Sequence, residues 1–145
     1  MVIRARVNAK AVGQPRGRAV VRGNRAFIVS AFKGHPVLEF KAAVRNAVFD
    51  EFARSGAAPF NWATLTVDCV VARPRSHLKA NGSVRASAQP FPTKPDVDNV
   101  LKAVMDALNG VAYPDDARLT AVSATCRYSD DQTDCVDIIV SEVSP

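Results

Sequence analysis

The spacing of hydrophobic positions changes along the chain and predicts a small α/β protein. Residues 1–12 alternate apolar and basic side chains with a period of two, which indicates a strand with one wet, basic face. Two further apolar runs, RAVV and RAFIV, flank Gly23-Asn24, a dipeptide suited to a tight hairpin turn because glycine accepts positive φ. These runs predict a strand and a β-hairpin at the start of the chain.

Two helices are predicted by apolar side chains that recur at steps of three and four residues. The first follows Pro36 and ends at Gly56, and its apolar positions are Val37, Phe40, Ala43 or Val44, Ala47 or Val48, and Phe52. The second runs from about residue 97 to Asn109-Gly110, and its predicted apolar side consists of Val97, Leu101, Val104, Met105 and Leu108.

Three more strands complete the predicted order. Residues 62–73 are rich in β-branched side chains and indicate a central strand, whereas LTAVSATCRYS and CVDIIVSEV indicate two terminal strands that form a hairpin. The order is therefore β-β-β-α-β-loop-α-β-β. We expect an α/β (α+β) fold in which one mixed sheet of five to six strands packs with two main helices.

Composition fits one folded domain over residues 1–145, because 48% of the residues are hydrophobic and 23% are charged. No stretch approaches the roughly 18 apolar residues of a membrane span, and the charged start is not typical of a signal peptide. We therefore expect a cytoplasmic protein with no membrane partner.

Cys69, Cys126 and Cys135 lack metal-ligand spacing and lie in strand-like runs, so we expect them buried and reduced.

A net charge of +5 favours a polyanion, with nucleic acid as the leading partner. Several arginines lie on the predicted N-terminal hairpin. They either protect an edge strand from pairing with another chain or contact phosphates. Residues 74–93 form a long Pro/Gly/Ser-rich loop that contains basic side chains and no acid, and we expect it to order on a polyanion. The candidate DNA-binding residues are Arg16, Arg18, Arg73, Arg75, Lys79, Arg85 and Lys94.

Acids gather in residues 94–116, KPDVDNVLKAVMDALNGVAYPDD, around the second predicted helix. Asp96 and Asp98 stand before and in its first turn, whereas Asp115 and Asp116 follow its end. Each acid has an ordinary explanation as a helix cap, a spaced ion pair or a turn residue. Together they match the oxygen ligands that Mg²⁺ prefers, and a nearby Lys102 suits a phosphate, so the segment predicts metal-dependent phosphodiester hydrolysis.

The same segment closely resembles the signature of the RusA family of Holliday junction resolvases. In that signature, Lys-Pro-Asp-x-Asp-Asn-x-x-Lys-x-x-x-Asp-x-Leu is followed by an Asp-Asp pair. The flanks agree, with a G-x-P-x-x-R element at Gly13, Pro15 and Arg18 and an Arg-Pro-Arg run at residues 73–75. Where the family often has a lysine before the arginine of this element, the chain has Arg16.

The resemblance spans essentially the whole chain and implies a function. It makes Asp96, Asp98 and Asp116 the metal-binding catalytic acids and Lys102 the catalytic lysine, with Asp115 a neighbour. We interpret Asp106 as a spectator or a residue that supports the site. It implies a homodimer that cuts four-way DNA with Mg²⁺, or Mn²⁺ in its place, in recombination and repair. Such enzymes are often encoded by phages or prophages and act at the nucleoid.

Two other functions remain open on the residues alone. In a non-catalytic module for branched DNA, the acids would be structural. An enzyme of another class would act on RNA, small phosphoesters, or other branched or flapped nucleic acids. The arginines and lysines are spread over at least three segments, which favours a long polyanion over a small phosphoester.

Overall fold

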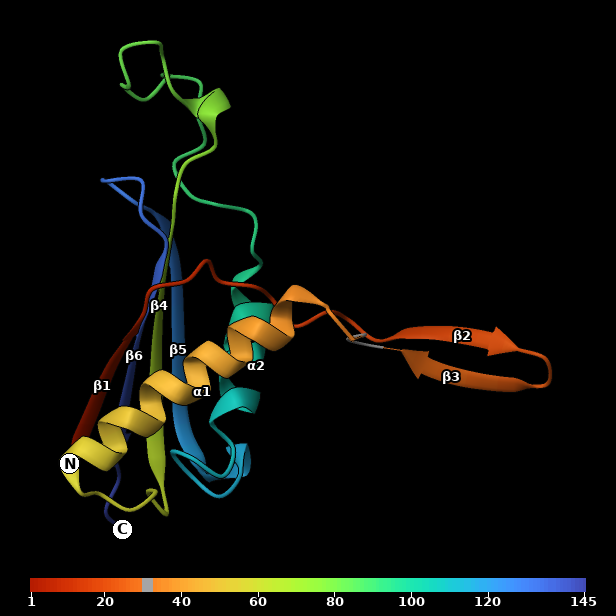
Figure 1. Cartoon of the computed structure of the whole chain (residues 1–145), viewed down its shortest axis with the longest axis vertical. Coiled ribbons are helices and arrows are strands. Elements are labelled where there is room, and N and C mark those ends of the chain that lie inside the picture. The colour runs from red at the N-terminus through yellow and green to blue at the C-terminus, as the bar shows by residue number, and fades with distance from the viewer. Residues whose placement is uncertain (30–32) are drawn as a thin grey trace.

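The computed structural model, which describes residues 1–29 and 33–145, has two main helices packed on one face of a β-sheet (Figure 1). The helices are α1 (Pro36–Ser55) and α2 (Val97–Leu108). The sheet consists of β1 (Val2–Val7), β4 (Ala63–Val71), β5 (Leu119–Tyr128) and β6 (Cys135–Glu142). A separate hairpin is formed by β2 (Arg18–Arg22) and β3 (Arg25–Val29), and two short 3₁₀ turns are η1 (Arg75–His77) and η2 (Asp116–Arg118).

The predicted α/β class, element order and two main helices are confirmed, but the six strands are divided between two sheets. Four strands form the sheet in the order β1-β6-β4-β5, and β2 pairs only with β3. The Gly23-Asn24 turn, with Gly23 at a φ of 62°, joins Arg22 to Arg25 as predicted. The hairpin stays apart because its two strands satisfy each other's hydrogen bonds, and none of the side chains described between Arg18 and Ile28 is buried in the core.

The prediction that the two terminal strands form a hairpin is wrong, because β4 lies between them. β5 pairs parallel to β4 on one side, and β6 pairs antiparallel to β4 on the other. Parallel pairing needs a crossover connection, and α2 supplies it between β4 and β5. The polar loop after β5 then crosses the end of β4, where the Asp134 carboxylate accepts from the Ala72 amide at 2.8 Å and the Ser129 amide donates to the Val71 carbonyl.

The core lies between the helices and the sheet. β1 buries every second residue, and α1 buries Val37, Phe40, Val44, Val48 and Phe52, as their spacing predicted. The C-cap of α1 is Gly56, which has a left-handed φ of 70°. The local sequence therefore predicted both the end of α1 and the positions of its buried residues.

The buried face of α2 differs from the predicted one by part of a turn. Its buried residues are Val100, Ala103, Val104, Ala107 and Leu108. The larger Val97 is exposed, while Leu101 and Met105 are only partly buried. The two alanines explain the difference, because small side chains let the helix approach the sheet closely and leave the bulkier residues at its side.

The three cysteines are free thiols, as expected, although only Cys69 is buried. Cys69 and Cys126 are paired across β4 and β5, with their sulfur atoms 3.2 Å apart. Cys126 and Cys135 are partly exposed. Within the described residues, no helix combines the length and apolar character needed to cross a membrane.

Candidate active site

Two carboxylates and an amine meet at the first turn of α2. Asp96 occupies the N-cap position without a side-chain cap hydrogen bond, and Asp98 lies two residues further on. The Lys102 amine lies 3.4 Å from the Asp98 carboxylate, one helical turn along the same face. The side chains of Asp96 and Asp98 are 51% and 53% exposed, so solvent and a large ligand can reach them.

The two carboxylates share a hydrogen bond, which shifts their pKa values in opposite directions. The pKa of Asp96 is raised from its ordinary value because Asp96 shares that hydrogen bond with Asp98. The pKa of Asp98 is lowered by the same hydrogen bond and then by Lys102. Two adjacent acids that compete for one proton also form a favourable place for a cation, because a cation removes the repulsion between them.

The N-terminal segment with Gly13 and Arg16 packs on this turn of α2. The Gln14 amide donates to the Asn99 carbonyl at 2.9 Å, and a β-carbon on Gly13 would meet the Asn99 β-carbon at 3.0 Å. The Arg16 guanidinium lies 3.8 Å from the Asp96 carboxylate, and the Asn99 amide lies 3.4 Å from it. Arg16 is therefore placed beside the acids, and Gly13 is the residue that permits the close approach.

Asn99 was missed as a site residue by the sequence reasoning, although the signature contains it. Its side chain contacts Asp96, while its backbone holds the N-terminal segment. The signal was present in the Asp-x-Asp-Asn run, where an amide follows directly on the second acid. An amide at this position joins two segments that are distant in sequence.

The other acids of the segment lie at the opposite end of α2. Asp106 pairs with Lys41 of α1 at 2.9 Å, and it makes no ion pair with Lys102. Asp115 caps η2 by accepting from the Ala117 amide, which gives this residue a structural role. Asp116 begins η2. Burial raises the pKa of Tyr113, and the negative charges of Asp116 and Asp106 raise it further.

One chain therefore brings Asp96, Asp98 and Lys102 together and leaves Asp116 elsewhere. The twelve residues of α2 span about 18 Å at 1.5 Å per residue, and this length separates the two ends. In residues 1–29 and 33–145, no group of three or more His, Cys, Asp or Glu side chains is close enough to hold a metal ion. The Asp96–Asp98 pair has the hard oxygen donors that Mg²⁺ takes, and it would leave room for water and a phosphate oxygen.

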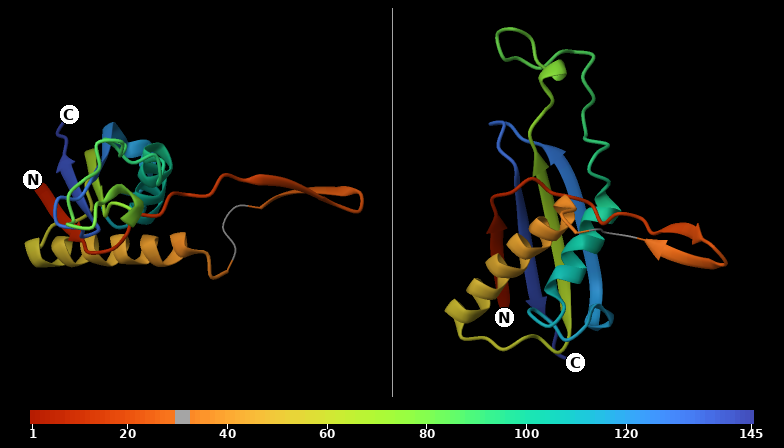
Figure 2. Two further views of the ribbon diagram at one scale, coloured as in Figure 1. Left: turned by 90° about the horizontal axis from the view of Figure 1, so that it is seen from above. Right: turned by 45° about the vertical axis from the view of Figure 1, so that its right-hand side comes forward.

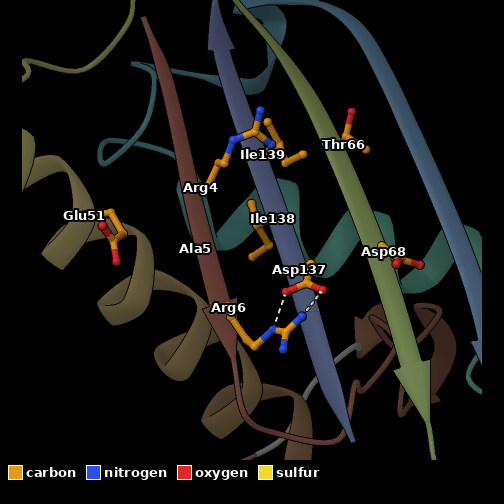
Figure 3. A pocket seen from close by; sticks show the side chains of 9 residues that line it. All are labelled: Arg4, Ala5, Arg6, Glu51, Thr66, Asp68, Asp137, Ile138 and Ile139. Carbon is orange, nitrogen blue, oxygen red and sulfur yellow. Dashed lines mark hydrogen bonds and ion pairs between the residues drawn. The ribbon is translucent and has the colours of Figure 1, made fainter. Parts of the chain in front are cut away.

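A cavity of about 460 Å³ adjoins the pair on the side of β5. Its lining includes Asp96 and Val97 from the start of α2, and Ala124, Thr125 and Cys126 from β5. A larger cavity, of about 590 Å³, lies on the sheet face that the helices leave uncovered (Figure 3). That second cavity is lined by the Arg6–Asp137 ion pair and contains none of the candidate acids, so we do not include it in the site.

Of the basic residues predicted to bind DNA, Arg18 lies on the hairpin and Arg75, Lys79 and Arg85 lie on the 74–93 loop, which are two projections from the body. The hairpin extends sideways, and residues 74–93 extend beyond the end of the sheet (Figure 2). Arg16, Arg18, Arg75, Lys79, Arg85 and Lys94 are exposed. Arg73 is half-buried, because its guanidinium lies 4.3 Å from the centre of the Tyr128 ring and donates to the Gln89 carbonyl. These contacts of Arg73 hold the 74–93 loop against the end of β5.

Comparison with known proteins identifies the family. The model of the family described as "Endodeoxyribonuclease RusA" matches residues 8–140, which is nearly the whole chain. The chain belongs to the RusA endodeoxyribonuclease family. It is also 28% identical over 148 residues to the "Uncharacterized protein YqaN" of Bacillus subtilis (strain 168), a match that covers 98% of this chain and 97% of that protein.

Membership of the RusA family supports a nuclease that acts on branched DNA. The match includes the first turn of α2, the hairpin and the 74–93 loop. The exposed acids and the basic projections therefore lie within the stretch that the family model matches. The family assignment also agrees with the mixed α/β fold.

We expect arginine removal on the hairpin of this RusA-family chain to weaken DNA binding in a salt-dependent way. Arg18→Ala should reduce the slope of log K against log salt by about 0.9, the value for one lost phosphate contact. Fluorescence anisotropy on a labelled four-way junction at several salt concentrations measures this slope. Arg54→Ala is the control, because Arg54 lies at the far end of α1 and pairs with Glu51. If the slope of log K against log salt were the same for wild type and Arg18→Ala, a phosphate contact by Arg18 would be excluded.

Proposed function

We propose that this protein is a Mg²⁺-dependent endodeoxyribonuclease that resolves Holliday junctions by paired symmetric nicks. The observation that carries the proposal is the exposed Asp96–Asp98 pair with Lys102 beside it, on a chain of net charge +5. RusA family membership supports the reaction class and the branched DNA substrate. We also propose that the enzyme is a homodimer, since two symmetric nicks require two sites related by a two-fold axis.

In this proposal, Asp96 and Asp98 hold the metal ion, and Asp116, which lies beyond the far end of α2, is not among the ligands that one chain supplies. Mg²⁺ bound there would polarise the scissile phosphate and make a water molecule easier to deprotonate. Mn²⁺ is the alternative ion, because it takes the same oxygen ligands. Metal binding requires both carboxylates to be ionised, so the raised pKa of Asp96 opposes metal binding at acidic pH.

Lys102 is proposed to contact the scissile phosphate. Its side chain is 62% exposed and extends from the same helical face as Asp98. An amine at this place would stabilise negative charge that develops on the phosphate oxygens in the transition state. Arg16, 3.8 Å from Asp96, would contact a neighbouring phosphate and bring the strand to the acids.

The decisive experiment compares a labelled four-way junction with a linear duplex of the same arm sequence, with Mg²⁺ or with a chelator. We expect nicked duplex products from the junction in Mg²⁺, little cutting of the linear duplex and no products with the chelator. Junction binding without products under any divalent ion would instead indicate a non-catalytic module. Equal cutting of linear DNA, flaps or RNA would indicate a different nuclease.

A further inference from the structure

Two cysteine thiols meet between the neighbouring strands β4 and β5. Cys69 and Cys126 are directly paired in the parallel register of these strands, which lie side by side in Figure 1, and their sulfur atoms are 3.2 Å apart. The two residues are 57 positions apart in the sequence, so only the fold brings them together. The third cysteine, Cys135 of β6, is paired with Val70, so it faces the opposite side of the sheet from Cys69.

The backbone places this pair where a disulfide can form. Directly paired residues of neighbouring strands present their side chains on the same face of the sheet. Neighbouring strands lie about 4.7–4.9 Å apart, which is within the Cα–Cα range of about 4.4–6.8 Å that a disulfide spans. Joining Cys69 to Cys126 therefore needs rotation of the two side chains and little movement of either strand.

The two thiols differ in their access to solvent. Cys69 is 0% exposed and belongs to the hydrophobic core, whereas Cys126 is partly exposed at the edge of that core. Cys126 also lines the cavity of about 460 Å³ between β5 and the start of α2, together with Pro95 and Val97. A small oxidant dissolved in water therefore reaches Cys126 first, and the Cys69 thiol lies directly behind it.

Electrostatics assigns the same order of reaction to the two thiols. The hydrogen bond with Cys69 lowers the pKa of Cys126, whereas this hydrogen bond and burial raise the pKa of Cys69. The thiolate is the reactive form of cysteine, so Cys126 is the nucleophile toward an oxidant. An accessible thiol with a second thiol beside it is the arrangement of redox-sensitive cysteines.

We propose that Cys69 and Cys126 form a reversible disulfide when a hydroperoxide reaches Cys126. The Cys126 thiolate attacks a peroxide oxygen, the O–O bond breaks, hydroxide leaves, and Cys126 becomes a sulfenic acid. The Cys69 sulfur then attacks the Cys126 sulfur, the S–O bond breaks, and the hydroxyl leaves as water with the proton of the Cys69 thiol. The two thiols lose two electrons and two protons in total, and hydrogen peroxide is reduced to two water molecules.

The Cys69 thiol decides whether oxidation of Cys126 can be reversed. A thiol reductant returns a disulfide to two thiols, whereas a sulfenic acid that finds no second thiol is oxidised further to a sulfinic acid, which thiols do not reduce. A sulfinate at Cys126 would add a negative charge to the cavity that Asp96 also lines. Cys69 therefore protects this cavity from a permanent change of charge. The disulfide requires no nuclease activity, so it can be tested separately from the proposed function.

Thiol counting tests the disulfide directly. The reduced protein is treated with hydrogen peroxide at low protein concentration, and its free thiols are then counted in denaturant with dithionitrobenzoate. We expect three free thiols to fall to one, with a mass loss of two hydrogen atoms and a linked pair of peptides that contain Cys69 and Cys126. Dithiothreitol should restore all three thiols. Three unchanged thiols, or a disulfide that includes Cys135, would overturn the proposal.

Substitutions assign a role to each sulfur atom. Cys69→Ser should stop at the sulfenic acid of Cys126, which dimedone traps, and prolonged peroxide treatment should remove that thiol permanently. Cys69→Ala repeats the test if the serine variant fails to fold. Cys135→Ser is the matched control, because it keeps the pair and should form the disulfide as fast as the wild type. A Cys69→Ser protein whose thiols dithiothreitol fully restores after prolonged treatment, or a Cys135→Ser protein without a disulfide, would contradict these roles.

Discussion

Asp98→Asn is expected to abolish junction cleavage, with a rate loss of at least about 10²–10³-fold, the loss that follows when a single hydrogen-bond donor to a transition state is removed. The substitution keeps the shape of the side chain and removes the charge that would hold the metal. Asp98 is exposed, so the variant should fold normally. DNA binding should be unchanged or tighter, because the change removes a negative charge and leaves every basic residue in place.

Single-turnover cleavage of a labelled four-way junction in Mg²⁺, beside binding measured without divalent metal, separates these two effects. Asp106→Asn is a matched control: it makes the same chemical change on the same helix, where the carboxylate pairs with Lys41 of α1. The control should cleave nearly normally. An Asp98→Asn protein that nicks junctions at the wild-type rate would contradict the assignment of the site.

Tyr113→Ala is expected to destabilise the protein by about 3–5 kcal/mol, the range for truncating a large aromatic side chain in a core. Tyr113 has no exposed surface, and its hydroxyl donates to the Met105 carbonyl at 3.1 Å. It fixes the segment after α2 against the helix, and the same segment leads to Asp116. A loss of this size removes a large part of the roughly 5–15 kcal/mol that stabilises a typical domain.

Urea denaturation followed by circular dichroism measures this loss as a lower midpoint with an unchanged slope. Tyr113→Phe keeps the ring and removes only the hydrogen bond, so it should cost about 1 kcal/mol. A small loss for Tyr113→Ala, similar to that for Tyr113→Phe, would mean that the ring is not a core residue. The pair of variants therefore separates packing from hydrogen bonding.

Local patterns predicted those elements whose boundaries depend on nearby residues. The period of two in β1 and the period of three to four in α1 each identified a buried face, and Pro36 and Gly56 marked the ends of α1. The same reasoning placed the buried face of α2 incorrectly, because it gave weight to Leu101 and Met105 over Ala103 and Ala107. Hydrophobicity alone does not show how closely a helix approaches its sheet.

The acid pair was predictable from sequence because Asp96, Asp98 and Lys102 lie within seven consecutive residues at the start of α2. The position of Arg16 beside Asp96 was not, since it depends on the packing of Gly13 and Gln14 on Asn99, a residue far away in the chain. Sequence proximity also suggested one cluster for all the acids, but a rigid helix keeps its two ends apart.

The element order, the hairpin turn, the α1 core positions and the acidic segment follow from local spacings of two to four residues. In contrast, three features depend on tertiary packing: β4 separates β5 from β6, the β2–β3 hairpin stands apart, and Asp116 lies away from Asp96 and Asp98. These features depend on which strand edges meet and on the length of α2, which are relations between distant segments that no local pattern contains.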